Sequence, residues 1–311
     1  MTHLQDLSIL ISKSLTLVVS RLYQPPYDSL IMGELFGFKK QLPRWLINDL
    51  TSAGLIHVVV VSGYNISFLM TYMHRILRIF KLHKNLTYIL ALVLTFIYVC
   101  FVGFSPPVVR AYIMSCILLF GKMLGRRSSM IYVIGVSAIF MAIFNLEILQ
   151  SISFQLSFAS TIGLVSLSGL ISEKMEKIFG LQNPKLKILV KFKDLFFSSF
   201  CESIACSILT WPIISFYFRR VSILSPIPNA LGLFTVPVVT VLGSLSLITY
   251  KVPGPVSFIL AFVTTLFLKY FVFIAHLFSN TGIAYLQVNK EFLIFYYVVI
   301  AIYILKKEFI V

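Results

Sequence analysis

The sequence carries little charge. Only 12% of its 311 residues are Asp, Glu, Lys or Arg, whereas 59% are hydrophobic. A soluble domain has about 25% charged residues and seldom contains repeated apolar runs of about 20 residues. Because this chain has several such runs, we expect a lipid bilayer rather than water as its solvent.

Acidic residues are scarcer than basic ones: 11 Asp plus Glu stand against 26 Lys plus Arg, a formal net charge of +15. Basic loops on the cytoplasmic side produce such an excess in multi-pass membrane proteins. A path for nucleic acid or another anionic substrate would also favour it. Charge alone favours the first interpretation.

Several sequence features of other protein classes are missing. The four cysteines (Cys100, Cys116, Cys201 and Cys206) lie in apolar stretches without a CxxC pair, which favours small packed side chains over disulfides or metal ligands. No GxxxxGK[ST] loop is present, so ATP hydrolysis by that route is not expected. The N-terminus lacks the basic region of a cleavable signal peptide. We expect no cofactor and no metal site.

Two amphipathic helices are predicted ahead of the spanning region. Apolar residues at helical spacing predict one over residues 4–22, and Pro25-Pro26 ends it. A second covers about 43–53, between a proline and a glycine. We therefore expect residues 1–54 to form N-terminal amphipathic or interfacial helices, and residues 55–311 to form a multi-helix membrane domain.

Apolar runs predict about nine membrane segments. They cover roughly 55–74, 86–104, 108–124, 130–148, 152–171, 195–218, 228–250, 255–280 and 292–305. The expected fold is all-α, a polytopic helical membrane protein with about eight to ten transmembrane or re-entrant helices. If the segments alternate and the 75–84 loop is cytoplasmic, 16 basic residues lie inside and six outside, which supports this orientation.

The first segment is interrupted by small and polar residues. It reads GLIHVVVVSGYNISFLMTYM, with Ser62-Gly63 in the middle and His57 and Asn65 nearby. Backbone groups freed by a break are tolerated at membrane depth only beside protein or a water-filled cavity. The alternative is a small-residue contact between helices.

An arginine lies at the start of the third segment. Within GFSPPVVRAYIM, residues 103–114, two prolines break the chain and Arg110 follows in the first helical turn. An arginine at the centre of a span costs about 2.5–3.5 kcal/mol, so Arg110 is expected to face a cavity or a partner, or to snorkel to the headgroups. Glu202, the one acidic residue clearly within a predicted span, is its hypothetical partner.

Two later segments also carry polar residues. In SFQLSFASTIGL, Ser157 belongs to a stripe of small hydroxyl residues and Gln155 points to nearly the opposite face, which predicts an enclosed helix. Such a stripe commonly packs helices together. In PIPNALG, Asn229 directly follows two prolines, which suggests a broken helix beside a pathway.

These four stretches, in this order over residues 25–250, resemble the ComEC family of competence proteins, the inner-membrane DNA-uptake channels of natural transformation. The resemblance implies a channel in the bacterial cytoplasmic membrane that passes single-stranded DNA inward. It also implies membrane lipid, an external DNA receptor and a cytoplasmic helicase-like ATPase as partners, and leaves a homo-oligomer open. The expected channel-lining residues are His57, Ser62, Gly63, Asn65, Arg110, Gln155, Ser157, Glu202 and Asn229.

The sequence departs from the family pattern at two points. The usual Ser-Gly-Leu-His is here Ser62-Gly63-Tyr64-Asn65, so a second histidine is missing. Full-length relatives add an oligonucleotide-binding-type domain and a metallo-β-lactamase-like nuclease domain, and neither is found here. Five histidines cannot form an HxHxDH metal motif in this chain. We therefore expect it not to be an enzyme and not to degrade DNA by itself.

Three other interpretations stay open. His57 and Ser62 could serve an intramembrane serine hydrolase if the helix is broken between them. The chain could be a small-molecule or lipid transporter, although no convincing internal repeat is present. It could also be an inactive remnant of a longer competence protein.

Overall fold

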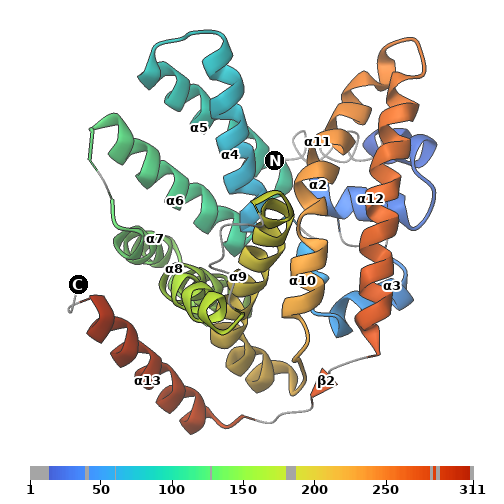
Figure 1. Cartoon of the computed structure of the whole chain (residues 1–311). Helices are drawn as coiled ribbons and strands as arrows, with labels where there is room; N and C mark the ends of the chain where they lie inside the picture. Colours follow the sequence, from blue (N-terminus) through green and yellow to red (C-terminus); the bar gives the residue numbers. More distant parts are fainter. Residues whose placement is uncertain are drawn as a thin grey trace. The chain divides into compact units, whose positions relative to one another are not determined.

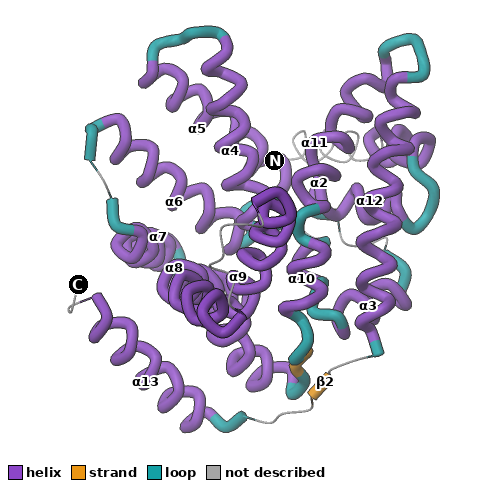
Figure 2. The backbone as a smooth tube through the Cα atoms, in the orientation of Figure 1, coloured by secondary structure: helices purple, strands orange, loops and turns teal. Residues whose placement is uncertain are grey.

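The computed structural model describes residues 14–38, 42–59, 61–126, 128–179, 187–280, 283–284 and 288–308, and nearly all of them are helical (Figure 2). Six described helices are long and apolar enough to cross a membrane: Lys84–Val102, Pro106–Met123, Ile152–Ile178, Phe196–Phe218, Pro226–Lys251 and Val256–Ser279. They coincide with six of the nine predicted segments. The expected fold class, a polytopic helical membrane protein, is confirmed.

The chain divides into two compact units, residues 1–112 with 232–280 and residues 113–231 with 281–311. The elements of the first unit are a helix over residues 14–22, α2 (Tyr27–Phe36), α3 (Arg44–Ser52), η1 (Ile56–Val58), α4 (Gly63–Ile79), α5 (Lys84–Val102), the start of α6 (Pro106–Met123), α11 (Thr235–Ile248), η4 (Thr249–Lys251) and α12 (Val256–Ser279) (Figure 1). Those of the second are the rest of α6, α7 (Met130–Phe144), η2 (Leu146–Gln150), α8 (Ile152–Phe179), α9 (Lys187–Phe218), β1 (Val221–Ser222), α10 (Pro226–Gly232), β2 (Ile283–Ala284) and α13 (Lys290–Glu308).

The N-terminal region differs in part from the expectation. The helix over residues 14–22 agrees with the predicted amphipathic helix, whose residues 4–13 lie outside the described residues. Helix α3 confirms the second one: Pro43 precedes it with ψ 142, and Gly54 follows it in the left-handed region at φ 77. Helix α2 was not expected, and most of its residues are buried.

Helix α2 is enclosed within the first unit, where it contacts α5, α11 and α12. Seven consecutive residues, Ser29–Leu35, are buried. A Cβ on Gly33 would lie 2.5 Å from the carbonyl oxygen of Val59, so the glycine lets α2 pack directly on the backbone that follows η1. The buried hydroxyl groups of Tyr23 and Ser246 share a hydrogen bond of 2.7 Å next to this helix's start. The short helix α2 is thus packed among the apolar helices α5, α11 and α12.

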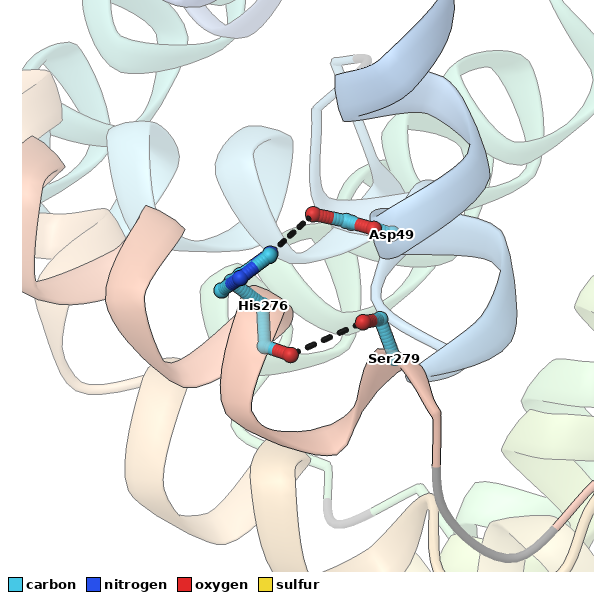
Figure 3. A network of polar contacts seen from close by, with 3 residues as sticks. All are labelled: Asp49, His276 and Ser279. Atoms are coloured by element: carbon cyan, nitrogen blue, oxygen red, sulfur yellow. Dashed lines mark hydrogen bonds and ion pairs between the residues drawn. The ribbon is translucent and has the colours of Figure 1, made fainter.

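Helices α3 and α12 of the same unit pack along each other, and a histidine–aspartate contact joins them (Figure 3). Nδ1 of His276 lies 2.7 Å from Oδ2 of Asp49, and the hydroxyl of Ser279 donates to the carbonyl of His276. The imidazole is 70% exposed. His276 therefore lies at the accessible end of α12, where an exposed pair contributes roughly 0–1 kcal/mol.

In the second unit, α8 and α9 form the most extensive helix pair, and small residues allow their close approach. A Cβ on Gly163 would clash with the carbonyl oxygen of Ala205. The thiol of Cys206 contacts the carbonyl of Ser160 at 3.4 Å across the same interface. Such small-residue contacts are the common way for helices to associate in lipid, where no hydrophobic force drives them together.

Helix α9 passes through Pro212 without ending. A proline lacks the N–H that would bond the carbonyl four residues earlier, which here belongs to Ile208. The hydroxyl of Tyr296 on α13 donates to that carbonyl at 2.8 Å, and Tyr297 donates to the carbonyl of Leu209. Helix α13 therefore satisfies the backbone acceptor that the proline frees, as a buried or lipid-facing carbonyl requires.

The cysteines are all free. Cys201 is buried and Cys116 and Cys206 are partly buried, which agrees with the expected packing role, but Cys100 is exposed on α5. The expectation of a small buried residue is wrong for Cys100, whose side chain is exposed among the described residues.

Candidate polar site around the break before α4

The predicted span over residues 55–74 is not one helix. It begins as the short η1, continues through Ser62 in an extended conformation (φ −100, ψ 166), and starts again as α4 at Gly63. No side chain caps the start of α4. The hydroxyl of Ser62 donates instead to the side-chain Oδ1 of Asn65 at 3.3 Å. The backbone N–H of Asn65 donates to the backbone carbonyl of Ser62 at 3.1 Å. The break at Ser62-Gly63, one of the two interpretations of this stretch, is present in the structure.

Arg110 lies directly over this break. A Cβ on Gly63 would lie 2.5 Å from Nη2 of Arg110 and 3.2 Å from the carbonyl oxygen of Pro107. A side chain at position 63 would displace this guanidinium and press lightly on the first turn of α6. The guanidinium of Arg110 is thus placed beside the N-terminus of α4, which carries a partial positive charge of about +0.5. The guanidinium and the positive end of the α4 dipole therefore lie next to each other.

Asn65 anchors the break to α2. The residue is 2% exposed, and its Nδ2 donates to the carbonyl oxygen of Glu34 at 3.3 Å. Oε1 of Glu34 accepts a hydrogen bond of 3.4 Å from the hydroxyl of Thr240, and Tyr98 donates to the carbonyl of Leu35 at 2.9 Å. A cavity of about 10 Å³, room for one water at most, adjoins Glu34. The arrangement holds the broken segment in a fixed position.

Glu34 is the residue that sequence reasoning missed. It is 6% exposed and lies on α2, outside the six spanning helices. Burial raises the pKa of its carboxyl group well above the usual range, and the hydrogen bond from Thr240 opposes that rise only in part. A buried acid is a rare feature in a chain with 11 Asp plus Glu. In the sequence, only the apolar run around Glu34 in YDSLIMGELF indicated that this acid is buried.

His57 does not join this cluster. It lies on η1 with an exposed side chain. The Ser62 hydroxyl is directed to Asn65 rather than to His57. The pairing that a serine hydrolase needs, a base within hydrogen-bonding reach of the nucleophile, is therefore not formed by these two described residues.

The second unit contains the other predicted residues. Asn229 on α10 is 7% exposed; its Nδ2 donates to the hydroxyl of Ser203 at 3.2 Å, while its Oδ1 has no hydrogen-bond partner among the described residues. A buried acceptor of this kind costs about 1–3 kcal/mol unless it meets a donor. A donor supplied by water or by a passing ligand would satisfy it.

The remaining predicted residues contact their own helices or adjoining turns. Nε2 of Gln155 donates to the carbonyl of Leu149, and Glu202 is exposed and accepts from the hydroxyl of Ser198. Ser157 is buried, and its carbonyl accepts bonds from two hydroxyl groups one turn later on α8. The structure thus joins Ser62, Gly63, Asn65 and Arg110 in one site. The Arg110–Glu202 pair involves residues of different units and stays a prediction.

A comparison with protein-family models identifies the family of this chain. A family model described as "Competence protein" matches residues 35–309. The chain belongs to the competence protein family. This confirms the resemblance drawn from the four motifs, all of which include residues within the matched range. Together with the six membrane-length apolar helices, family membership establishes a multi-pass membrane protein.

One curated protein is similar to part of this chain. ComE operon protein 3 of Bacillus subtilis (strain 168) is 28% identical over 178 residues, which make up 57% of this chain and 21% of the relative. The match therefore spans about a fifth of that protein. No solved structure matches the chain significantly.

Proposed function

We propose that this competence-family protein forms a channel in the bacterial cytoplasmic membrane that passes single-stranded DNA inward during natural transformation. Membership of the family supports a role in DNA uptake, and the observation that carries the channel is the position of Arg110. Its guanidinium lies over Gly63 at the uncapped start of α4, in the first turns of a membrane-length helix.

The physical problem for such a channel is the phosphate charge of each nucleotide in a low-dielectric slab. A helix N-terminus and a guanidinium that face the same point attract an anion from both sides, because backbone N–H groups and the arginine both donate hydrogen bonds to phosphate oxygens. The arrangement is therefore suited to a phosphate that passes the start of α4.

The other residues take weaker roles in the proposal. Ser62 and Asn65 hold the break open, and the open Oδ1 of Asn229 can accept from a base amino group. His57, Gly63, Gln155, Ser157 and Glu202 complete the proposed lining. Weak polar contacts suit transport, since a site that binds too tightly would stop the strand.

The proposal includes an arrangement and partners. Residues 1–54 would form the interfacial part and residues 55–311 the channel part, with the lysine-rich loops in the cytoplasm. An external DNA receptor would deliver the strand and a cytoplasmic helicase-like ATPase would pull it. The chain itself would carry out no hydrolysis. A homo-oligomer would place several copies of the Arg110 site around one route.

The test is DNA uptake in cells that carry single-residue variants in place of the native protein. Arg110→Gln should reduce nuclease-protected cytosolic DNA by about tenfold or more, since removing a charged partner of a desolvated phosphate costs roughly 1.5–3 kcal/mol, whereas Arg110→Lys should retain part of it. Surface-bound DNA should be unchanged in both. The matched control is Arg126→Gln, which removes an exposed arginine from the loop after α6.

Equal uptake by Arg110→Gln and Arg126→Gln, at equal protein levels in the membrane, would contradict the assignment of Arg110 to the route. Loss of uptake by both variants to the same degree would point to net charge rather than to this site, and would contradict it as well.

A further inference from the structure

Helix α4 carries a row of aromatic rings on one face. Tyr64, Phe68 and Tyr72 follow each other at intervals of four residues, which places them on one stripe of the helix. The ring centroids of Tyr64 and Phe68 are 6.2 Å apart, and those of Phe68 and Tyr72 are 4.2 Å apart. The guanidinium of Arg75 continues the row, 6.0 Å from the ring centre of Tyr72. Together these four residues form what we call the α4 ladder.

The ladder is accessible and lies on a polar face. Tyr64 and Tyr72 are 53% and 37% exposed, and the neighbouring Ser67 and Thr71 are exposed as well. The opposite side of α4 contributes the buried Ile66 and Met70. Helix α4 is not among the six described helices that are long and apolar enough to cross a membrane. A face of this composition is poorly suited to lipid tails.

The ladder ends at a basic cleft. The turn between α4 and α5 forms a cleft of about 410 Å³ lined by His74, Arg78, Lys81, Lys84 and Tyr88, among others. The imidazole of His74 stacks on the ring of Tyr88 at 4.7 Å, and Nζ of Lys84 lies 6.0 Å from that ring's centre. Residues 50–146 contain no Asp or Glu. The cleft therefore carries positive charge that no acid on the adjoining helices neutralises.

We propose that the α4 ladder and the basic cleft together form a binding track for single-stranded DNA, in which bases stack on Tyr64, Phe68 and Tyr72 and phosphates are held by Arg75 and the cleft cations. The inference rests on the proposed channel function and names the surface that contacts the strand. Rows of aromatic side chains beside a basic groove are the general means of binding single strands without reading sequence, because every base has a stacking face.

The track connects to the site at the break. Tyr64 directly follows Gly63, over which Arg110 lies, and Tyr72 is about 12 Å further along the helix axis. The track thus has a cation from α6 at its start, the rings of α4 in its middle and the cations of α4 and the following turn at its end. This order provides a strand with alternating points of attachment along its length.

An anionic lipid headgroup is the competing occupant of the cleft. Ile79 and Phe80 beside it are 77% and 69% exposed, and basic clefts at the ends of spanning helices also attract lipid phosphate. A lipid headgroup accounts for the cleft but not for a row of three rings, two of them exposed, beside the exposed Ser67 and Thr71. For this reason single-stranded DNA is the occupant that explains both parts.

The experiment compares two oligonucleotides of equal length and phosphate number, an oligothymidine and its abasic analogue. The full chain is placed in nanodiscs of phosphatidylcholine, and binding is followed by fluorescence anisotropy. The triple variant Tyr64→Leu, Phe68→Leu, Tyr72→Leu should weaken oligothymidine binding by about tenfold or more and leave abasic binding unchanged. Arg78→Gln with Lys81→Gln should weaken both and reduce the dependence of binding on salt.

Two controls separate stacking from folding. Phe140 and Phe144 on the apolar α7 form an exposed ring pair at the same spacing of four residues, with centroids 4.9 Å apart, so Phe140→Leu with Phe144→Leu should change neither affinity. Tyr64→Phe with Tyr72→Phe keeps the rings and should retain oligothymidine binding. Thermal unfolding of every variant in detergent shows whether the fold is kept.

Equal affinity of the native protein for the two oligonucleotides would contradict base stacking on the α4 ladder. A triple variant that binds like the α7 control would contradict it as well. In either case the proposed channel is judged separately by the dependence of uptake on Arg110. Complete displacement of oligothymidine by nanodiscs that contain phosphatidylglycerol, at constant salt, would assign the cleft to lipid and overturn the track.

Discussion

At the scale of single residues, the contact between Gly63 and Arg110 decides whether a cation stands at the break. A Cβ at position 63 would meet the end of a flexible side chain at 2.5 Å, so the guanidinium rather than the backbone would have to move. The role of this glycine is therefore to leave room for a charge. Its conformational freedom is less important, because α4 begins there with ordinary helical geometry.

Gly63→Ala should reduce DNA uptake several-fold while lowering stability by no more than about 1–3 kcal/mol, the usual cost of overpacking. Uptake and thermal unfolding in detergent are measured on the same variant. Gly135→Ala on α7 is the matched control, since a Cβ there meets nothing within 4 Å. If both alanine variants take up DNA normally, the displaced guanidinium has no part in transport.

Glu34 provides a prediction of pH dependence. Burial raises the pKa of its carboxyl group above the usual value of 4.5, so the folded state holds a proton that the unfolded state releases, and stability falls as pH rises above that value. Each unit of the rise costs about 1.4 kcal/mol once the group is charged in the unfolded chain. Glu34→Gln removes this titration.

The melting temperature of Glu34→Gln in detergent should equal or slightly exceed that of the native protein near pH 4, and the difference should grow towards pH 8. Glu147→Gln replaces an exposed acid on η2 and serves as the control. A difference between Glu34→Gln and the native protein that stays constant over this range would show that Glu34 is solvated in the folded state.

At the scale of elements, the sequence predicted those features that depend on neighbours in the chain. Apolar length alone located six membrane helices, and Ser62-Gly63 indicated the break before α4 because small residues loosen a helix locally. Contacts between segments that are distant in the sequence could not be predicted from it. Asn65 meets Glu34 across 31 positions, and the Tyr296 hydroxyl meets the carbonyl freed by Pro212 across 88.

The pairing of α8 with α9 can be tested on one helix. Gly163→Ala would push a Cβ against the carbonyl oxygen of Ala205, and since that obstacle is backbone the helices would have to separate. We expect a loss of about 1–3 kcal/mol in thermal unfolding. Gly169→Ala, also on α8 and with nothing within 4 Å, should be neutral or stabilise by up to about 1 kcal/mol. Equal melting temperatures would contradict the close contact.

At the scale of the whole molecule, hydropathy identified a multi-pass membrane protein and four motifs identified its family, because both are patterns written along the chain. The polar site was predicted in part. Arg110, Gly63 and Asn65 were named from their unusual residue types at membrane depth, whereas Glu34 was missed because its helix has no side-chain N-cap and no apolar periodicity that would distinguish it from an apolar loop. The α4 ladder was likewise not predicted, because aromatic residues make up 15% of the chain and these three do not stand out among them.

The central claim is that these helices enclose a hydrated route for a polyanion, and the current through planar bilayers that contain the purified full chain tests it most directly. The account predicts a steady ionic current that single-stranded DNA interrupts in events whose duration rises with strand length, with fewer events for Arg110→Gln and none for duplex DNA. A protein that is folded and inserted, yet gives no current or gives a current that single-stranded DNA never interrupts, would contradict it.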